Sequence, residues 1–233
     1  MKRILILPVL FLTLLAGTPA FSADFQKGFA AYESGDLATA LREFAPLAEQ
    51  GVAVVQSLLG WMYEKGQGVP QDYKTAVKWY RLAAEQGDAD AQYNLGLMYQ
   101  KNHGVPQDYK TAVKWYRLAA EQGVSSAQHN LGVMYEGGWG VSKDDKTAVK
   151  WYRLAAKQGN ANAQYNLGWM YEEGQGVPKD NVYAYMWWDI AASSGDKDAI
   201  SGRDAISKLM NSTDISTAKK LVRECLHKRY KRC

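Results

Sequence analysis

A period of 36 residues constrains the fold of this chain more than any other feature of its sequence. Tryptophan follows this period at Trp79, Trp115, Trp151 and Trp187, and glycine follows it at Gly60, Gly96, Gly132 and Gly168. The stretch from Gly68 to Gly87 recurs unchanged from Gly104 to Gly123. Self-similarity at one fixed period is the signature of architectures in which small units stack in a row. We therefore expect a repeat array rather than one globular core.

Each repeat is predicted to form two antiparallel helices joined by a loop. In the second repeat Ala91, Leu95 and Tyr99 are spaced to lie on one face of a first helix. Trp115 and Tyr116 belong to the apolar face of the second helix. One such pair cannot bury its own apolar face, so neighbouring pairs must stack. The expected fold is all-α: an α-solenoid, a right-handed superhelix of stacked antiparallel helix pairs with helical N- and C-terminal caps.

Polar and small residues mark the ends of these helices. Aspartates that can cap the second helices are Asp72, Asp108, Asp144 and Asp180. Glycines that can end them are Gly87, Gly123, Gly159 and Gly195. Gly96 stands inside a first helix, where glycine costs up to about 1 kcal/mol relative to alanine. Its recurrence predicts that a partner helix approaches too closely for a side chain.

The pattern A-x-x-x-L-G-x-x-Y-x-x-G-x-G-V-x-x-D-x-x-x-A-x-x-W-Y-x-x-A-A-x-x-G resembles the Sel-one-like repeat, a longer-period relative of the tetratricopeptide repeat. Four repeats are expected, over residues 52–87, 88–123, 124–159 and 160–195. Residues 24–51 resemble a shorter tetratricopeptide-like helix pair, which would form an N-terminal cap. Residues 196–233 are expected to form a C-terminal helical cap.

The fourth repeat departs from the pattern in a way that predicts its neighbours. It has Val182, Met186 and Asp189 where the repeat before it has Lys, Lys and Arg. An apolar surface at the end of a stack has to be covered. We expect it to pack against C-terminal helices at roughly 198–210 and 214–229.

The first 23 residues have the layout of a secretory signal peptide. Lys2 and Arg3 precede an apolar run at 4–15 that is too short for the roughly 20 residues a membrane span needs. Cleavage is predicted between Ala20 and Asp24, and no cysteine lies there to accept a lipid. The mature protein is expected to be periplasmic or secreted, with no transmembrane segment. Its net charge near +2 and its export argue against nucleic acid as a partner.

The two cysteines, Cys225 and Cys233, are predicted to form a disulfide in an oxidising compartment. A continuous helix between them would separate their Cα atoms by roughly 12 Å, beyond the ~7 Å that a disulfide tolerates. The helix must therefore end between them. Two free thiols are the alternative.

Catalytic and metal-binding patterns are largely absent. The histidines, His103, His129 and His227, lack metal-ligand spacing, and no cofactor is expected. The family resemblance implies a second hypothesis, because some relatives are linked to β-lactam binding or hydrolysis. Two Ser-x-x-Lys matches exist, Ser194 to Lys197 and Ser216 to Lys219, but neither is accompanied by Ser-Asp-Asn or Lys-Thr-Gly. We predict no catalytic residue and a binding protein, with the hydrolase as the alternative.

The predicted binding surface is the concave side, which the first helices line in tetratricopeptide-like stacks. Its candidate residues are Ser57, Trp61 and Glu64; Tyr93, Leu97 and Gln100; His129, Val133 and Glu136; and Tyr165, Trp169 and Glu172. Aromatic side chains among polar ones suit an interface with a protein or peptide. The alternative is that Trp61 and Trp169 are partly buried between repeats.

A basic band is predicted on the second helices. Its members are Lys74, Lys78 and Arg81; Lys110, Lys114 and Arg117; and Lys146, Lys150 and Arg153. An anionic envelope polymer or an acidic partner could use this outer band. A solvated face with ion pairs of the Arg81 to Glu85 type is the simpler interpretation.

Overall fold

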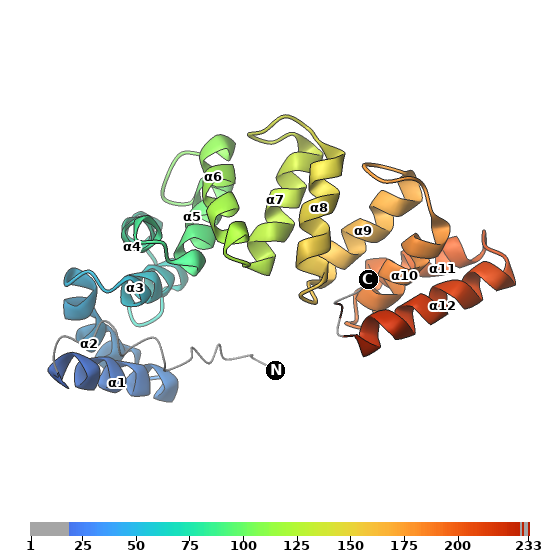
Figure 1. Ribbon diagram of the computed structural model, residues 1–233. Helices are drawn as coiled ribbons and strands as arrows, with labels where there is room; N and C mark the ends of the chain where they lie inside the picture. The colour runs from blue at the N-terminus through green and yellow to red at the C-terminus, as the bar shows by residue number, and fades with distance from the viewer. Residues whose placement is uncertain (1–18, 229, 231–232) are drawn as a thin grey trace. The chain divides into compact units, whose positions relative to one another are not determined.

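The computed structural model describes residues 19–228, 230 and 233, and side chains from residue 24 on. Within these residues it consists of helices, with no strand (Figure 1). The helices are α1 (Pro19–Ser34), α2 (Leu37–Glu49), α3 (Ala53–Lys65), α4 (Tyr73–Glu85), α5 (Ala89–Lys101), α6 (Tyr109–Glu121), α7 (Ser125–Gly137), α8 (Asp145–Ala156), α9 (Ala161–Glu173), α10 (Asn181–Ala192), α11 (Lys197–Ser207) and α12 (Ser212–His227). Consecutive helices pack in pairs, as the all-α solenoid prediction requires.

The chain divides into two compact units between Asp88 and Ala89. The first unit holds α1 to α4, and the second holds α5 to α12. Most of the predicted signal peptide lies outside the described residues, and α1 already begins at Pro19. None of the described helices is long and apolar enough to span a membrane.

The predicted capping residues begin and end the helices. The Asp108 carboxylate accepts hydrogen bonds from the backbone amides of Lys110 and Thr111, at 3.0 and 3.1 Å. It also accepts the Thr111 hydroxyl at 2.6 Å, and these bonds hold the pKa of Asp108 below its ordinary value. Gly123, after α6, has φ of 93°, in the left-handed region that ends helices.

An aromatic ring explains the glycine inside each first helix. A Cβ on Gly132 would lie 2.5 Å from Cε1 of Tyr152, a fully buried residue of the second helix in the same repeat. Gly60 and Gly96 face Tyr80 and Tyr116 in the same way. The predicted close approach is therefore made by an aromatic ring of the second helix. Alanine could not take this position without moving that ring.

The C-terminal helices cover the apolar fourth repeat. Met186 and Trp187 of α10 are 1% and 2% exposed, and they share one core with Ala199 of α11 and Val222 of α12. Asp189, which replaces the arginine of the preceding repeat, forms an ion pair at 3.0 Å with Arg203 of α11. The observed α11 and α12 begin and end within a few residues of the ranges predicted for them.

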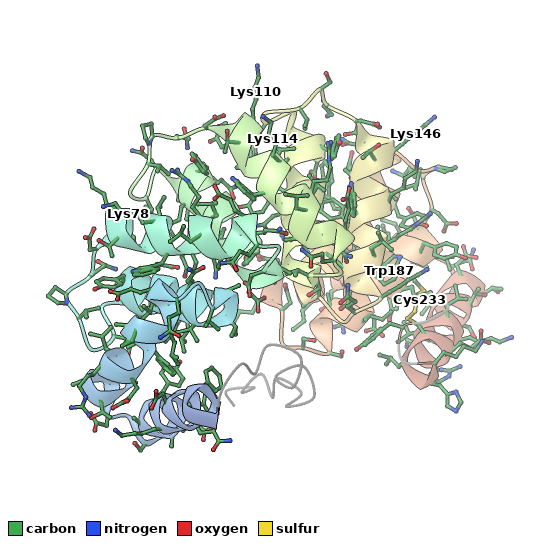
Figure 2. The ribbon with its side chains drawn as sticks, turned by 60° about the vertical axis from the view of Figure 1, so that its left-hand side comes forward. Lys78, Lys110, Lys114, Lys146, Trp187 and Cys233 are labelled. Carbon is green, nitrogen blue, oxygen red and sulfur yellow. A yellow bond between two sulfur atoms is a disulfide. The ribbon has the colours of Figure 1, made fainter. Side chains whose placement is uncertain are left out.

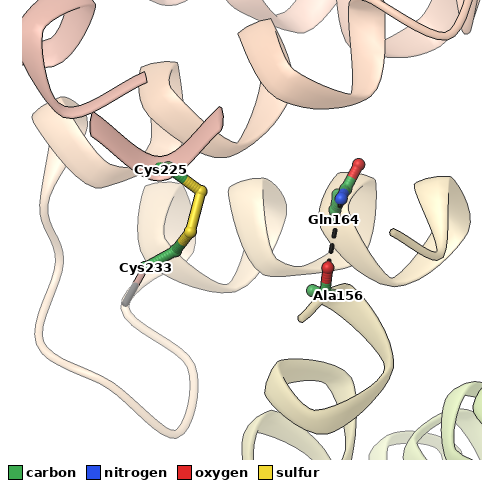
Figure 3. The surroundings of a disulfide bond; sticks show 4 residues. All are labelled: Ala156, Gln164, Cys225 and Cys233. Atoms are coloured by element: carbon green, nitrogen blue, oxygen red, sulfur yellow. Dashed lines mark hydrogen bonds between the residues drawn. A yellow bond between two sulfur atoms is a disulfide. The ribbon is translucent and has the colours of Figure 1, made fainter. Parts of the chain in front are cut away.

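A disulfide closes the chain after α12. Cys225 and Cys233 are bonded with their Cα atoms 5.2 Å apart, and α12 ends at His227, between them (Figure 3). The Tyr230 amide donates to the Cys225 carbonyl at 2.9 Å, and the Tyr230 ring faces Gly159 at the end of α8. The closed tail therefore returns to the junction between the third and fourth repeats.

Removing the disulfide is expected to destabilise the second unit. In the Cys225→Ser/Cys233→Ser variant, the free energy of unfolding should fall by about 2 to 3 kcal/mol, because the open tail regains chain entropy on unfolding. Urea denaturation followed by circular dichroism measures the change. Wild-type protein unfolded with a reductant present should show the same loss, and a variant as stable as the oxidised wild type would contradict the prediction.

Candidate protein-interaction face

The candidate binding residues of the second unit occupy equivalent positions on α5, α7 and α9. We call this row the first-helix face; its residues are Tyr93, Leu97, Gln100, His129, Val133, Glu136, Tyr165, Trp169 and Glu172. All nine are half-buried, so each offers part of its side chain to solvent. The corresponding residues of α3, in the first unit, are Ser57, Trp61 and Glu64. Ser57 is 9% exposed and therefore offers little surface to a partner.

The aromatic rings of the face pack on the second helices. Tyr93 lies 6.0 Å from Tyr116, measured between ring centroids, and His129 lies 5.8 Å from Tyr152. Burial lowers the pKa of His129, which favours a neutral imidazole. In the first unit Trp61 lies edge-on to Tyr32 of α1 at 6.0 Å. These rings therefore support the stack as well as lining its surface.

The third candidate of each repeat is tied to a tyrosine. The Tyr80 hydroxyl donates to Glu64 Oε2 at 2.8 Å, and the hydroxyls of Tyr116 and Tyr152 donate to Gln100 and Glu136. In the fourth repeat Trp188 replaces this tyrosine, and its indole N–H donates to the Tyr165 carbonyl at 3.1 Å. Glu172 consequently makes no hydrogen bond to any described residue. Its carboxylate is the one of this set left available to a ligand.

A row of asparagines was missed in the sequence, although it follows the 36-residue period through Asn94, Asn130 and Asn166. All three are half-buried on the first helices. Asn166 reaches toward the preceding repeat. Its amide lies 3.4 Å from His129 Nε2 on α7. An amide both donates and accepts hydrogen bonds, so this row can pair with a peptide backbone.

A hollow of about 360 Å³ opens between α7, α9 and the loops that follow them. Its lining residues are Val133, Glu136, Gly137, Trp139, Lys143, Asn166, Trp169 and Gln175. Val133, Glu136 and Trp169 are candidates from the sequence, and the structure brings them together here. Trp139, in the loop after α7, is 45% exposed and was not a candidate. In the sequence, the feature that could have indicated Trp139 as a binding residue is its position as a single large aromatic residue among glycines.

Buried glutamines clamp one repeat to the next, and the sequence did not indicate that they would be buried. Gln128 of α7 is 5% exposed, and its amide donates to the Ala120 carbonyl of the preceding repeat at 3.0 Å. Its own carbonyl accepts a hydrogen bond from Gln158 at 2.8 Å. The equivalent contacts are those of Gln56 with Ala48 and Gln86, and of Gln164 with Ala156 (Figure 3).

Replacing one clamp residue should measure its contribution. We expect Gln128→Leu to lower the free energy of unfolding by about 1 to 3 kcal/mol, because the Ala120 carbonyl loses its buried donor. Chemical denaturation gives the value. Gln107→Leu is the matched control, since Gln107 donates to the Gln100 carbonyl from an exposed position, and its effect should stay within about 0.5 kcal/mol. Equal losses in the two variants would contradict a special role for the clamp.

The basic band is only partly free. Arg117 donates to the Tyr135 hydroxyl at 2.7 Å, and Arg153 donates to the Tyr171 hydroxyl at 2.6 Å. Each bond runs from a second helix to the first helix of the next repeat. The ion-pair interpretation is wrong for Arg117, because no salt bridge joins it to Glu121. The phenol of the next repeat takes the place of that carboxylate.

The Ser-x-x-Lys matches lie apart from this face. Ser194 is exposed in the turn after α10, and Ser216 is exposed on α12. Among the described residues, neither serine hydroxyl is hydrogen-bonded to the lysine of its motif. His, Cys, Asp and Glu side chains in the same part of the chain form no cluster of three that could hold a metal ion.

Stacked helix pairs with a solvent-facing row of side chains define a repeat scaffold. The chain belongs to the Sel1 repeat family, whose family model matches residues 53–88, 89–124, 125–160 and 161–196. Proteins of this family generally serve as scaffolds for protein–protein interaction. A search of curated proteins returned no match.

Two solved structures support the same assignment. A Sel1 repeat protein from Oxalobacter formigenes is 38% identical, with a TM-score of 0.69, over 74% of this chain and 71% of its own. A protective antigen of uropathogenic Escherichia coli strains, which displays an SLR fold, is 40% identical over 82% of this chain, with a TM-score of 0.74. This chain spans only 41% of the length of that antigen.

Proposed function

We propose that this protein is an exported scaffold that holds an extended segment of a partner protein on its first-helix face, along α5, α7 and α9. The observation that carries the proposal is the hollow between α7 and α9, where Val133, Glu136 and Trp169 meet. Aromatic anchors in such hollows contribute much of the binding energy at protein interfaces. Trp139 and Trp169 supply the apolar contact here.

The polar groups around the hollow suit a peptide backbone. Asn166 and Gln175 line it with side-chain amides, which can donate to a peptide carbonyl and accept from a peptide N–H. Asn130 and Asn94 repeat the same amide along the face, one per repeat. An extended segment could therefore meet one amide in each repeat while its side chains enter the spaces between first helices.

Export is supported by two features of the chain. The N-terminal apolar run has the length of a signal peptide, and the two cysteines are paired. We propose that residues 1–23 are removed and that residues 24–51 and 196–233 cap the four repeats. The intact mass of the exported protein tests this assignment, and a chain that begins at Asp24 is the expected result.

Site-specific crosslinking in cells tests the binding face. A photoreactive amino acid replaces Val133, which lines the hollow, or Leu209, which is 77% exposed between α11 and α12. The proposal expects a discrete crosslinked partner from position 133 and none from position 209. Adding Trp169→Ala to the first variant should remove the crosslink. Crosslinks of equal yield from both positions, or no crosslink at position 133, would overturn the proposal.

A further inference from the structure

The second helix of each of the first three repeats carries two lysines and an exposed leucine at successive turns. On α6 these are Lys110, Lys114 and Leu118, and on α8 they are Lys146, Lys150 and Leu154. We call these six residues the lysine-leucine face; Lys110, Lys114 and Lys146 are labelled in Figure 2. Leu118 and Leu154 are 43% and 46% exposed, and no described residue forms a salt bridge with the four lysines. The face therefore offers apolar area beside ammonium groups that no described residue engages in a salt bridge, and Lys114 and Lys150 also attract the capping carboxylates of Asp108 and Asp144.

The fourth repeat shows how the same helix face is covered. On α10 the equivalent positions are Val182, Met186 and Ile190. Ile190 is fully buried, whereas Leu154 at the same place on α8 is exposed. Helix α11 comes after α10 in the chain, just as α9 comes after α8. Helix α9 does not cover Leu154, which stays exposed to solvent. Helix α12, which has no counterpart against α8, packs directly against α10 and shares its core.

Helix α6 also has a hollow on this side. A space of about 330 Å³ is lined by Tyr99, Thr111, Lys114, Trp115 and Leu118. An apolar side chain that enters it would contact Trp115 and Leu118. A carboxylate carried one helical turn away would come within reach of the ammonium group of Lys114. An apolar side chain with a carboxylate near it would therefore suit this hollow.

We propose that the lysine-leucine face binds an acidic amphipathic helix of a partner protein, which lies against α6 or α8 as α12 lies against α10. Leucine-type side chains of that helix replace the contacts that α12 makes through Val222 and Ala218. Its acidic side chains pair with the lysines that α10 lacks. A second copy of this chain does not fit, because α12, its own helix of this kind, exposes Lys219, Lys220 and Arg223. This surface is distinct from the first-helix face, so the two proposals stand separately.

Binding of a synthetic helix tests the proposal. The probe is a fluorescent peptide with leucines on one helical face and glutamates beside them, titrated into the full exported chain and followed by anisotropy. The control is a scrambled peptide of the same composition, which has the same net charge but no apolar helical face. The proposal expects saturable binding of the first peptide and at least about tenfold weaker binding of the second, since only the first buries its leucines.

Matched variants identify the surface. Because α4 carries the same residues, Lys78→Glu/Lys114→Glu/Lys150→Glu should abolish binding, and Leu82→Ser/Leu118→Ser/Leu154→Ser should weaken it about tenfold or more. Lys208→Glu/Lys219→Glu/Lys220→Glu makes the same charge change on exposed residues elsewhere and should leave binding within about twofold. Absence of binding, equal binding of the scrambled peptide, or equal loss in both lysine variants would overturn the proposal. Equal binding of the scrambled peptide would instead assign the lysines to anionic polymers.

Discussion

Replacing Trp187 with alanine is expected to lower the free energy of unfolding of the second unit by about 3 to 5 kcal/mol. Trp187 is 2% exposed and belongs to the core that joins α10 to α11 and α12. The substitution leaves a cavity in this core and removes apolar contacts on which α10, α11 and α12 pack together. Guanidinium denaturation followed by circular dichroism measures the loss.

The repeat supplies its own control for this substitution. Trp151 occupies the same position in the third repeat, but it is only half-buried because α8 has no helix like α12 against it. Trp151→Ala should therefore cost about half as much as Trp187→Ala or less, since less apolar area returns to water. If both substitutions lowered the free energy of unfolding equally, the packing of α11 and α12 on α10 would not bury Trp187 more effectively than Trp151.

The second large effect is expected at Gly132. In most helices glycine to alanine stabilises by up to about 1 kcal/mol. Here we expect Gly132→Ala to destabilise by about 1 to 3 kcal/mol, the usual cost of an overpacked core. The new methyl group would lie 2.5 Å from the Tyr152 ring. That ring cannot move freely, because it is fully buried and its hydroxyl is bound to Glu136.

A double-mutant cycle isolates this contact. In a Tyr152→Ala background the ring is gone, so Gly132→Ala should become neutral or stabilising as in an ordinary helix. The coupling between the two substitutions is the measured quantity, obtained from the unfolding free energies of the four proteins. An unchanged cost of Gly132→Ala in that background would contradict the proposed packing.

Much of the fold could be predicted because its signals are local and repeated. Asp108 marks the start of a helix by accepting nearby amides, and Gly123 marks an end through its positive φ, so both act within a few residues. Because these residues recur every 36 positions, the helix ends found in one repeat could be predicted in the others. The end of α12 between Cys225 and Cys233 also followed from elementary geometry, since a longer helix would hold the sulfurs apart.

Side-chain partners across the stack could not be predicted from the spacing alone. Arg117 had Glu121 one turn away as a plausible partner, yet it binds Tyr135 of the next repeat. Gln128 looks like a surface residue in the sequence, but stacking buries it against the Ala120 carbonyl. Which polar residues become internal depends on how two repeats approach each other. That relation is set by packing over both helices of each pair.

The candidate face shows the same limit. The sequence indicated positions that face away from the core, and on α5, α7 and α9 these side chains are half-buried. It did not indicate that Glu136 would be engaged by Tyr152, that Asn166 would join the face, or that Trp139 would complete the hollow. Trp61 depends on Tyr32 of α1, a helix outside the repeats, so the period carried no information about its surroundings.

Affinity capture with two tryptophan variants tests the scaffold account most directly. Tagged wild type, Tyr93→Ala/Trp169→Ala and Trp151→Ala are recovered from the cell envelope after crosslinking, and the partner is quantified by mass spectrometry. Helicity is measured on each purified protein, so that only folded variants are compared. We expect Tyr93→Ala/Trp169→Ala to lose the partner, whereas Trp151→Ala, which is changed outside the first-helix face, should retain it. Undiminished recovery by the double variant would contradict binding through that face.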